Sequence, residues 1–113
     1  MGLVVAPILP NKVDEWKAWT NEVVTTKIDE FSELNSRMNL TSHKVWLAHT
    51  PGGPMAVVSH EGPGGDEFMQ KLAASDHTFD QWFKSKIAEF HGIDFSKPPP
   101  GPMPEQMISW EAE

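Results

Sequence analysis

The feature that most constrains the fold is a pair of β-patterned runs on either side of a Pro-Gly-Gly-Pro turn. The runs read SHKVWLAHT over residues 42–50 and MAVVSHE over residues 55–61, and the turn residues 51–54 continue neither of them. A hairpin that closes with Thr50 opposite Met55 sorts the side chains onto two faces. One face carries His43, Val45, Leu47, His49, Ala56, Val58 and His60, and the other carries Lys44, Trp46, Ala48, Thr50, Met55, Val57 and Ser59. Since both faces are mostly apolar, both have to be buried.

Two helical regions and two further strands are predicted around this hairpin. Residues 2–9 form a short β-rich apolar run, and apolar residues at three- and four-residue steps predict one long helix over residues 12–38, with Asn11 as its N-cap and Asn39 as a left-handed stop. A second helical region starts near residue 66, begins again at Thr78 and ends at His91 and Gly92. A proline-rich arm over residues 94–104 predicts extended polyproline II, and the alternating segment 106–112 predicts a last strand.

The predicted order of elements is strand, helix, strand, strand, helix, strand. This is the βαββαβ pattern of a ferredoxin-like α+β sandwich, with an antiparallel four-stranded sheet and helices on one face. Residues 1–113 therefore form a single domain. Because one layer of helices covers only one face of the sheet, we expect the other face to be buried by self-association as a homodimer.

Composition disfavours several classes of protein. The net charge is -7 and the chain has a single arginine, Arg37, so nucleic acid is not an expected partner. The absence of cysteine excludes disulfides, thiol nucleophiles, thiolate-ligated haem, iron-sulfur clusters and structural zinc sites built on sulfur. The apolar run over residues 3–9 lacks a basic leader, is interrupted by Pro7 and is too short to span a membrane, so a cytoplasmic protein without a membrane partner is expected.

The candidate catalytic residues are His43 and His60, which the hairpin places as diagonal neighbours on one face. A buried neutral imidazole acts as a general base, a proton shuttle or a metal ligand near neutral pH. Three interpretations stay open for the pair: strand histidines bonded to backbone or water, an organic catalytic or binding site, and ligation of a metal or haem. No metal ligand is assigned, because two histidines lack a third partner. The candidate substrate-binding residues, which would favour a planar or apolar molecule, are His49, Trp46, Trp82, Trp110 and Phe83.

The element order, the two-faced hairpin and the stretches SDHTFDQWF and HGIDF resemble the dimeric α+β-barrel superfamily, in particular small proteins of the antibiotic-biosynthesis-monooxygenase and ether-degradation-associated types. The resemblance implies ferredoxin-like subunits that pair their sheets into a barrel. It also implies a small enzyme that acts on a hydrophobic or aromatic organic molecule by histidine-assisted proton abstraction, with monooxygenase-like oxygenation or a lyase-like reaction that needs no added cofactor. Two alternatives remain: a noncatalytic ligand-binding or stress-related barrel protein, and a haem-binding or haem-degrading relative.

Overall fold

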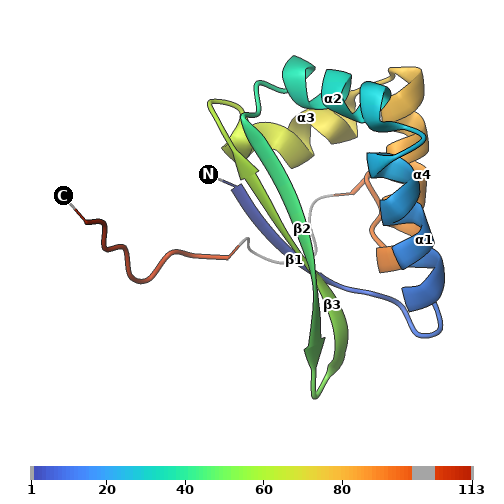
Figure 1. The fold of residues 1–113 in the computed structure, drawn as a ribbon, viewed down its shortest axis with the longest axis horizontal. Coiled ribbons are helices and arrows are strands. Elements are labelled where there is room, and N and C mark those ends of the chain that lie inside the picture. Colours follow the sequence, from blue (N-terminus) through green and yellow to red (C-terminus); the bar gives the residue numbers. More distant parts are fainter. Residues whose placement is uncertain (1, 98–103, 113) are drawn as a thin grey trace.

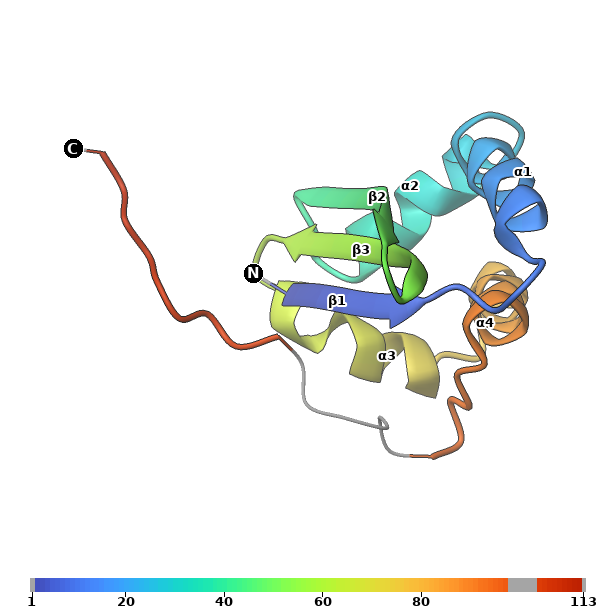
Figure 2. The same cartoon turned by 90° about the horizontal axis from the view of Figure 1, so that it is seen from below.

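A computed structural model describes residues 2–97 and 104–112. The chain is an α+β protein in which helices cover one face of a three-stranded antiparallel sheet (Figures 1 and 2). The strands are β1 (Gly2–Pro7), β2 (Ser42–Thr50) and β3 (Gly53–Glu61), in the order β1-β3-β2. The helices are α1 (Val13–Val24), α2 (Ile28–Arg37), α3 (Phe68–Ala74) and α4 (Thr78–His91), with a 3-10 turn, η1 (Gly65–Glu67), before α3.

The predicted hairpin forms, with the predicted division of side chains between its faces, but its register differs by two residues. Thr50 lies opposite Gly53 rather than Met55, and His43 lies directly opposite His60. The reason is the turn. Gly53 adopts a φ of 118°, a backbone conformation that residues other than glycine rarely adopt, and this conformation closes the hairpin tightly. The Thr50 hydroxyl donates a hydrogen bond to the Gly53 carbonyl at 2.7 Å. The strand therefore begins at Gly53, two residues before the apolar run.

The predicted helix over residues 12–38 is two helices. Thr25 ends α1: its hydroxyl donates to the carbonyl of Asn21 at 2.6 Å, and its N–H bonds three residues back, to Glu22. A threonine that bonds back to the preceding turn competes with helical hydrogen bonding and bends the chain. The prediction of Asn11 as N-cap is also wrong, since Lys12 holds that position and Asn11 is left-handed. The left-handed stops at Asn39 and Gly92 are confirmed.

The core lies between the helices and the covered face of the sheet. It is built mainly from aromatic and aliphatic side chains of the four helices, among them Trp16, Trp19, Val23, Leu34, Phe68, Leu72, Phe79, Phe83 and Phe90. A partly buried ion pair ties α2 to α4. The guanidinium of Arg37 donates to both carboxylate oxygens of Asp80 at 2.8 Å, and the Ser75 hydroxyl donates to the same carboxylate at 2.6 Å. Asp80 is fully buried, so this pair fixes the relative position of the two helices.

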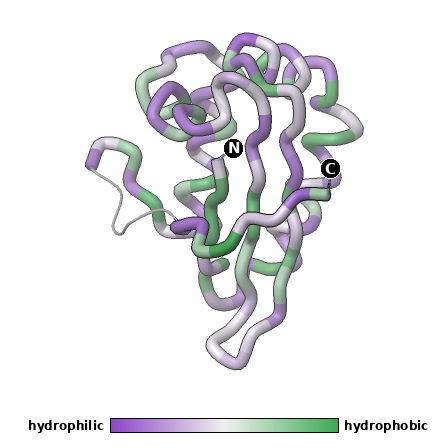
Figure 3. The backbone as a smooth tube through the Cα atoms, turned by 90° about the vertical axis from the view of Figure 1, so that its left-hand side faces the viewer, coloured by the Kyte–Doolittle hydropathy of each residue, from purple (hydrophilic) through white to green (hydrophobic). Residues whose placement is uncertain are grey.

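The other face of the sheet carries no helix in the described part of the chain. We call it the open face: it presents Leu3 and Val5 of β1, Lys44, Trp46 and Ala48 of β2, and Met55 and Val57 of β3. Trp46 is 51% exposed there and Val5 is 42% exposed. Figure 3 looks onto this face, and its colours show hydrophobic residues along parts of the strands.

The predicted fourth strand over residues 106–112 is not formed. Residues 104–112 have no regular secondary structure, are exposed throughout, and leave the body on the side of the open face (Figures 1 and 2). Within the described part of the chain, these residues pair with neither edge of the sheet. The sheet therefore has three strands, and the four-stranded ferredoxin-like arrangement is not seen. Most of the predicted polyproline arm, residues 98–103, lies outside the described residues.

No helix within residues 2–97 or 104–112 combines the length and the apolar character needed to cross a membrane.

Candidate functional site

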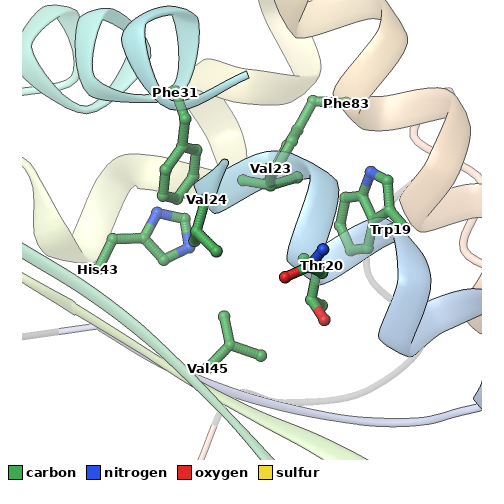
Figure 4. Close-up of a pocket in the computed structure, with 9 residues that line it drawn as sticks. Trp19, Thr20, Val23, Val24, Phe31, His43, Val45 and Phe83 are labelled. Atoms are coloured by element: carbon green, nitrogen blue, oxygen red, sulfur yellow. The ribbon is translucent and has the colours of Figure 1, made fainter. Parts of the chain in front are cut away.

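The break between α1 and α2 opens a cavity above the hairpin. Its volume is about 380 Å³, within the range of small-molecule sites. The end of α1 supplies Thr20, Asn21, Val23 and Val24, α2 supplies Phe31, β2 supplies His43 and Val45, and Trp19 and Phe83 close the inner side (Figure 4). Val24 and Val45 are both more than two-fifths exposed, so they mark the mouth of the cavity. Six of the nine described lining side chains are apolar or aromatic, and Thr20, Asn21 and His43 are the polar ones.

His43 is the ionisable group of this lining. Figure 4 shows its ring between Phe31 and Val45, with its edge toward Val24. Nδ1 of His43 lies 2.9 Å from the side-chain oxygen of Asn35 on α2. Because an amide oxygen only accepts hydrogen bonds, Nδ1 carries the proton and donates it, which leaves the lone pair of Nε2 as an acceptor. The helix thus sets the tautomer of a histidine on the strand.

His60 lies beneath His43 as its directly opposite partner on β3. The two imidazole rings meet edge to face with centroids 4.5 Å apart, and His60 stacks on Phe68 at 4.1 Å. His60 is only 2% exposed. A smaller cavity of about 60 Å³ shares Trp19, His43, Val45 and Phe83 with the first. His43, His60 and His91 all contribute to its lining. The ring of His91 is held at the sheet edge, since its Nδ1 donates to the carbonyl of Pro7 at 2.8 Å.

Burial keeps both central histidines neutral. Desolvation lowers the pKa of His43 to about 3, and the neighbouring His60 contributes to the same direction. Desolvation also lowers the pKa of His60 to about 4. At neutral pH the site therefore holds two uncharged imidazoles in an aromatic setting. Such a group accepts a hydrogen bond well, but it binds a proton weakly.

Trp19, which lines the cavity, carries a buried polar atom without a hydrogen-bond partner in the part of the chain that the structure describes. Its indole N–H is buried and has no hydrogen-bond partner among the described residues, although its ring packs against Phe83 and Phe90. A buried donor without an acceptor costs about 1–3 kcal/mol. The unpaired indole N–H of Trp19 therefore lowers the stability of the fold, in addition to the cost of leaving the cavity empty.

The structure brings together only part of the residues predicted from sequence. His43, His60 and Phe83 lie at the two cavities. His49 lies exposed near the hairpin turn, opposite Pro54, and Trp46 points to the open face. Trp82 packs on Phe79, with the Lys27 ammonium 5.3 Å from its ring, and Trp110 is exposed on the C-terminal segment. None of these last four lines either cavity.

Sequence reasoning missed Trp19, Phe31 and Asn35. Phe31 is one of the apolar residues whose spacing predicts the helix over residues 12–38, and its place at the cavity follows from the break in that helix. Asn35 carried no signal of its own, because its role depends on the position of α2 above β2.

Metal ligation finds little support in the arrangement of side chains. Within residues 2–97 and 104–112, no group of three or more histidine, aspartate or glutamate side chains lies close enough to hold a metal ion. His43 and His60 form a pair without a third ligand. Three carboxylate or imidazole donors are the usual minimum in a protein site that binds zinc.

Comparison with protein-family models, with curated proteins and with solved structures finds no match to this chain. The geometry of the cavity is therefore the basis for assigning a function.

Proposed function

We propose that this protein binds a small, largely apolar and planar organic molecule that carries one hydroxyl group. The observation that carries the proposal is the cavity of about 380 Å³ beside a neutral His43 whose tautomer is fixed by Asn35. Aromatic walls from Trp19, Phe31 and Phe83 favour a flat apolar body. The lone pair of Nε2 accepts a hydrogen bond from the hydroxyl group and orients the ligand. A single directional polar contact in an apolar pocket is typical of small-molecule sites.

Proton abstraction by His43 is the second candidate, and with it the cofactor-independent oxygenation that the resemblance implies. The lone pair of Nε2 faces a substrate cavity, as a general base requires. A pKa of about 3 opposes the step, however, because a phenolic hydroxyl has a pKa near 10 and each unit of mismatch costs about 1.4 kcal/mol. Catalysis therefore requires that the bound substrate, or closure of the site, raise the basicity of His43. Binding without reaction is the function that the free protein supports best.

A matched pair of ligands tests the proposal. 1-Naphthol carries the hydroxyl donor and 1-methoxynaphthalene does not, so we expect 1-naphthol to bind about 2- to 10-fold more tightly, the usual contribution of one hydrogen bond. Chemical-shift titration by NMR measures both affinities and locates the ligand. His43→Leu should abolish the difference, whereas His49→Leu, at the exposed end of the hairpin, should preserve it. Equal binding of the two ligands to the unmodified protein would refute the role of His43.

The same titration separates binding from catalysis. 1-Naphthol that is recovered unchanged after long incubation in air supports a noncatalytic protein, whereas oxygen uptake that is lost in His43→Leu supports the enzyme.

We also propose that two copies of the chain pair through their open faces. The support is the apolar surface around Val5, Trp46 and Val57, which no helix of the described chain covers. Sheets with both faces apolar are normally covered on both sides. Sedimentation velocity at micromolar concentration tests the pairing: we expect a dimer that Trp46→Asp dissociates, and a monomer at all concentrations would overturn it.

A further inference from the structure

The C-terminal segment, residues 104–112, presents large apolar side chains to water. Met107 is 80% exposed, Ile108 is 87% exposed and Trp110 is 83% exposed. These are the three most exposed of the large hydrophobic residues that the structure describes. Their alternation matches a β-strand, with Ile108 and Trp110 on one side and Met107 on the other. Such a cluster marks a binding surface rather than an ordinary solvated tail.

The direction of the segment indicates what it binds. Figures 1 and 2 show it leaving the body beside β1 and extending away from the open face, and in Figure 3 it passes in front of the sheet. It therefore occupies the space that a second copy enters when two open faces meet. The segment is acidic, with Glu105 and Glu111 and no basic residue, and the open face carries an exposed side chain of each sign, Lys44 and Glu61, so charge neither favours nor opposes the contact.

In the described part of the chain, the sheet has an unpaired edge, the outer edge of β1, to which such a strand can bind. Ile8 donates its N–H to the carbonyl of Pro54, which shows that even-numbered residues of β1 bond to β3. By the alternation of antiparallel ladders, the N–H and C=O groups of Leu3 and Val5 point to the outer edge of β1. Among the described residues no strand pairs with this edge. An exposed edge of this kind is a template for a strand from another chain.

The segment is long enough to reach it. Nine extended residues span about 30 Å, and two packed sheets lie about 10 Å apart. About 20 Å therefore remains after the gap is crossed, which is the length of a six-residue strand such as β1.

We propose that residues 104–112 of one copy add to the outer edge of β1 in a second copy of this chain, with Ile108 and Trp110 buried in the interface. A two-fold axis makes the exchange mutual, so each sheet gains from its partner the fourth strand that its own chain does not form. The proposal rests on the pairing of open faces proposed above, and it adds the identity of the segment that completes each sheet.

Cross-linking tests the exchange directly, because the chain has no cysteine and engineered thiols react alone. Two full-length single variants, Ala112→Cys, on the same side of the segment as Ile108 and Trp110, and Val5→Cys, on the open face, are mixed in equal amounts, treated with a short bifunctional maleimide and analysed by mass spectrometry. We expect the mixed product of one chain of each variant. Ser85→Cys, exposed on α4 in the helical layer, replaces Val5→Cys in the control and should give no such product.

Point variants provide an independent readout from sedimentation. Ile108→Asp should raise the dissociation constant of the dimer at least about tenfold, since it removes one buried aliphatic side chain. Ser109→Asp adds the same charge on the opposite side of the segment and should have a smaller effect.

The outcomes separate the two proposals. A dimer that gives no mixed product and tolerates Ile108→Asp means that the open faces pair without exchange of the segment, which overturns the exchange alone. A monomer at all concentrations overturns both. A monomer in which the double variant Val5→Cys/Ala112→Cys cross-links within one chain shows that the segment folds onto its own sheet, which also overturns the exchange.

Discussion

The buried histidine pair makes stability strongly dependent on pH between about 4 and 6.5. In the unfolded chain each histidine has a pKa of about 6.5. In the folded protein desolvation lowers the pKa of His60 to about 4, and that of His43 to about 3. Between these values the unfolded state binds more protons than the folded state, so stability falls as the pH falls. The contribution is fully present above pH 6.5 and is lost progressively below it.

The pKa values set the size of the effect. At pH 5, about 1.5 units below the unfolded-state pKa, each histidine that stays neutral in the fold costs about 2 kcal/mol, and the pair costs about 4 kcal/mol. A domain of this size is stable by about 5–15 kcal/mol in total, so the loss is a large fraction. Urea unfolding followed by tryptophan fluorescence at pH 7.5 and at pH 5 measures it.

Variants assign the effect to the pair. His60→Leu removes one titrating group and should reduce the loss between the two pH values by about 2 kcal/mol, whatever its effect at pH 7.5. His49→Gln is the matched control at an exposed position and should leave the loss unchanged. Equal stability of the unmodified protein at the two pH values would refute the view that both rings are neutral and buried in the fold.

Two further predictions concern the framework. Arg37→Met leaves the fully buried carboxylate of Asp80 without its counter-charge and should lower the free energy of unfolding by about 3 kcal/mol in urea unfolding at pH 7.5. Lys12→Met removes an exposed ion pair and should lower it by less than about 1 kcal/mol. Equal costs of the two variants would contradict a structural role for the ion pair of Arg37 and Asp80. Gly64→Ala places a methyl group against the main-chain oxygen of Met38 and should lower the unfolding midpoint or prevent folding, and a variant as stable as the parent would show that this approach is looser than described.

The sequence predicted the faces of the hairpin because they depend only on alternation along each strand. It did not predict the register, because the two-residue shift follows from the conformation of Gly53, and a Pro-Gly-Gly-Pro run allows more than one turn. A shift by two preserves the faces, so His43 and His60 stayed together even though their predicted pairing was diagonal.

Helical periodicity predicted only part of the core: Trp16, Val23 and Leu34 are buried, but the stripe also included Val24 and Ile28, which are exposed, and it did not predict where the helix breaks. Thr25 and Thr26 are weak helix formers rather than strong breakers, and the bend depends on a side-chain hydrogen bond within the last turn. Since the cavity lies at this bend, its lining by Trp19 and Phe31 was not predictable. The C-terminal strand is the opposite case: its alternating pattern is local, but pairing also requires that the segment lie along a sheet edge, and residues 104–112 extend away from the sheet (Figures 1 and 2).

Several unfavourable features gather at one place in the fold, and this favours a function there over a purely structural role. A well-packed core of this size has no need of an open cavity, a buried indole N–H without an acceptor, or two desolvated imidazoles. Local departures from good packing and satisfied polar groups are expected at functional sites, where stability is given up for binding. If that holds here, an apolar replacement of His43 should lower the affinity for a hydroxyl-bearing ligand while making the protein more stable in mild acid. A purely structural role predicts an unchanged affinity for that ligand, because the gain in mild acid follows from removing a titrating ring and is expected under either role.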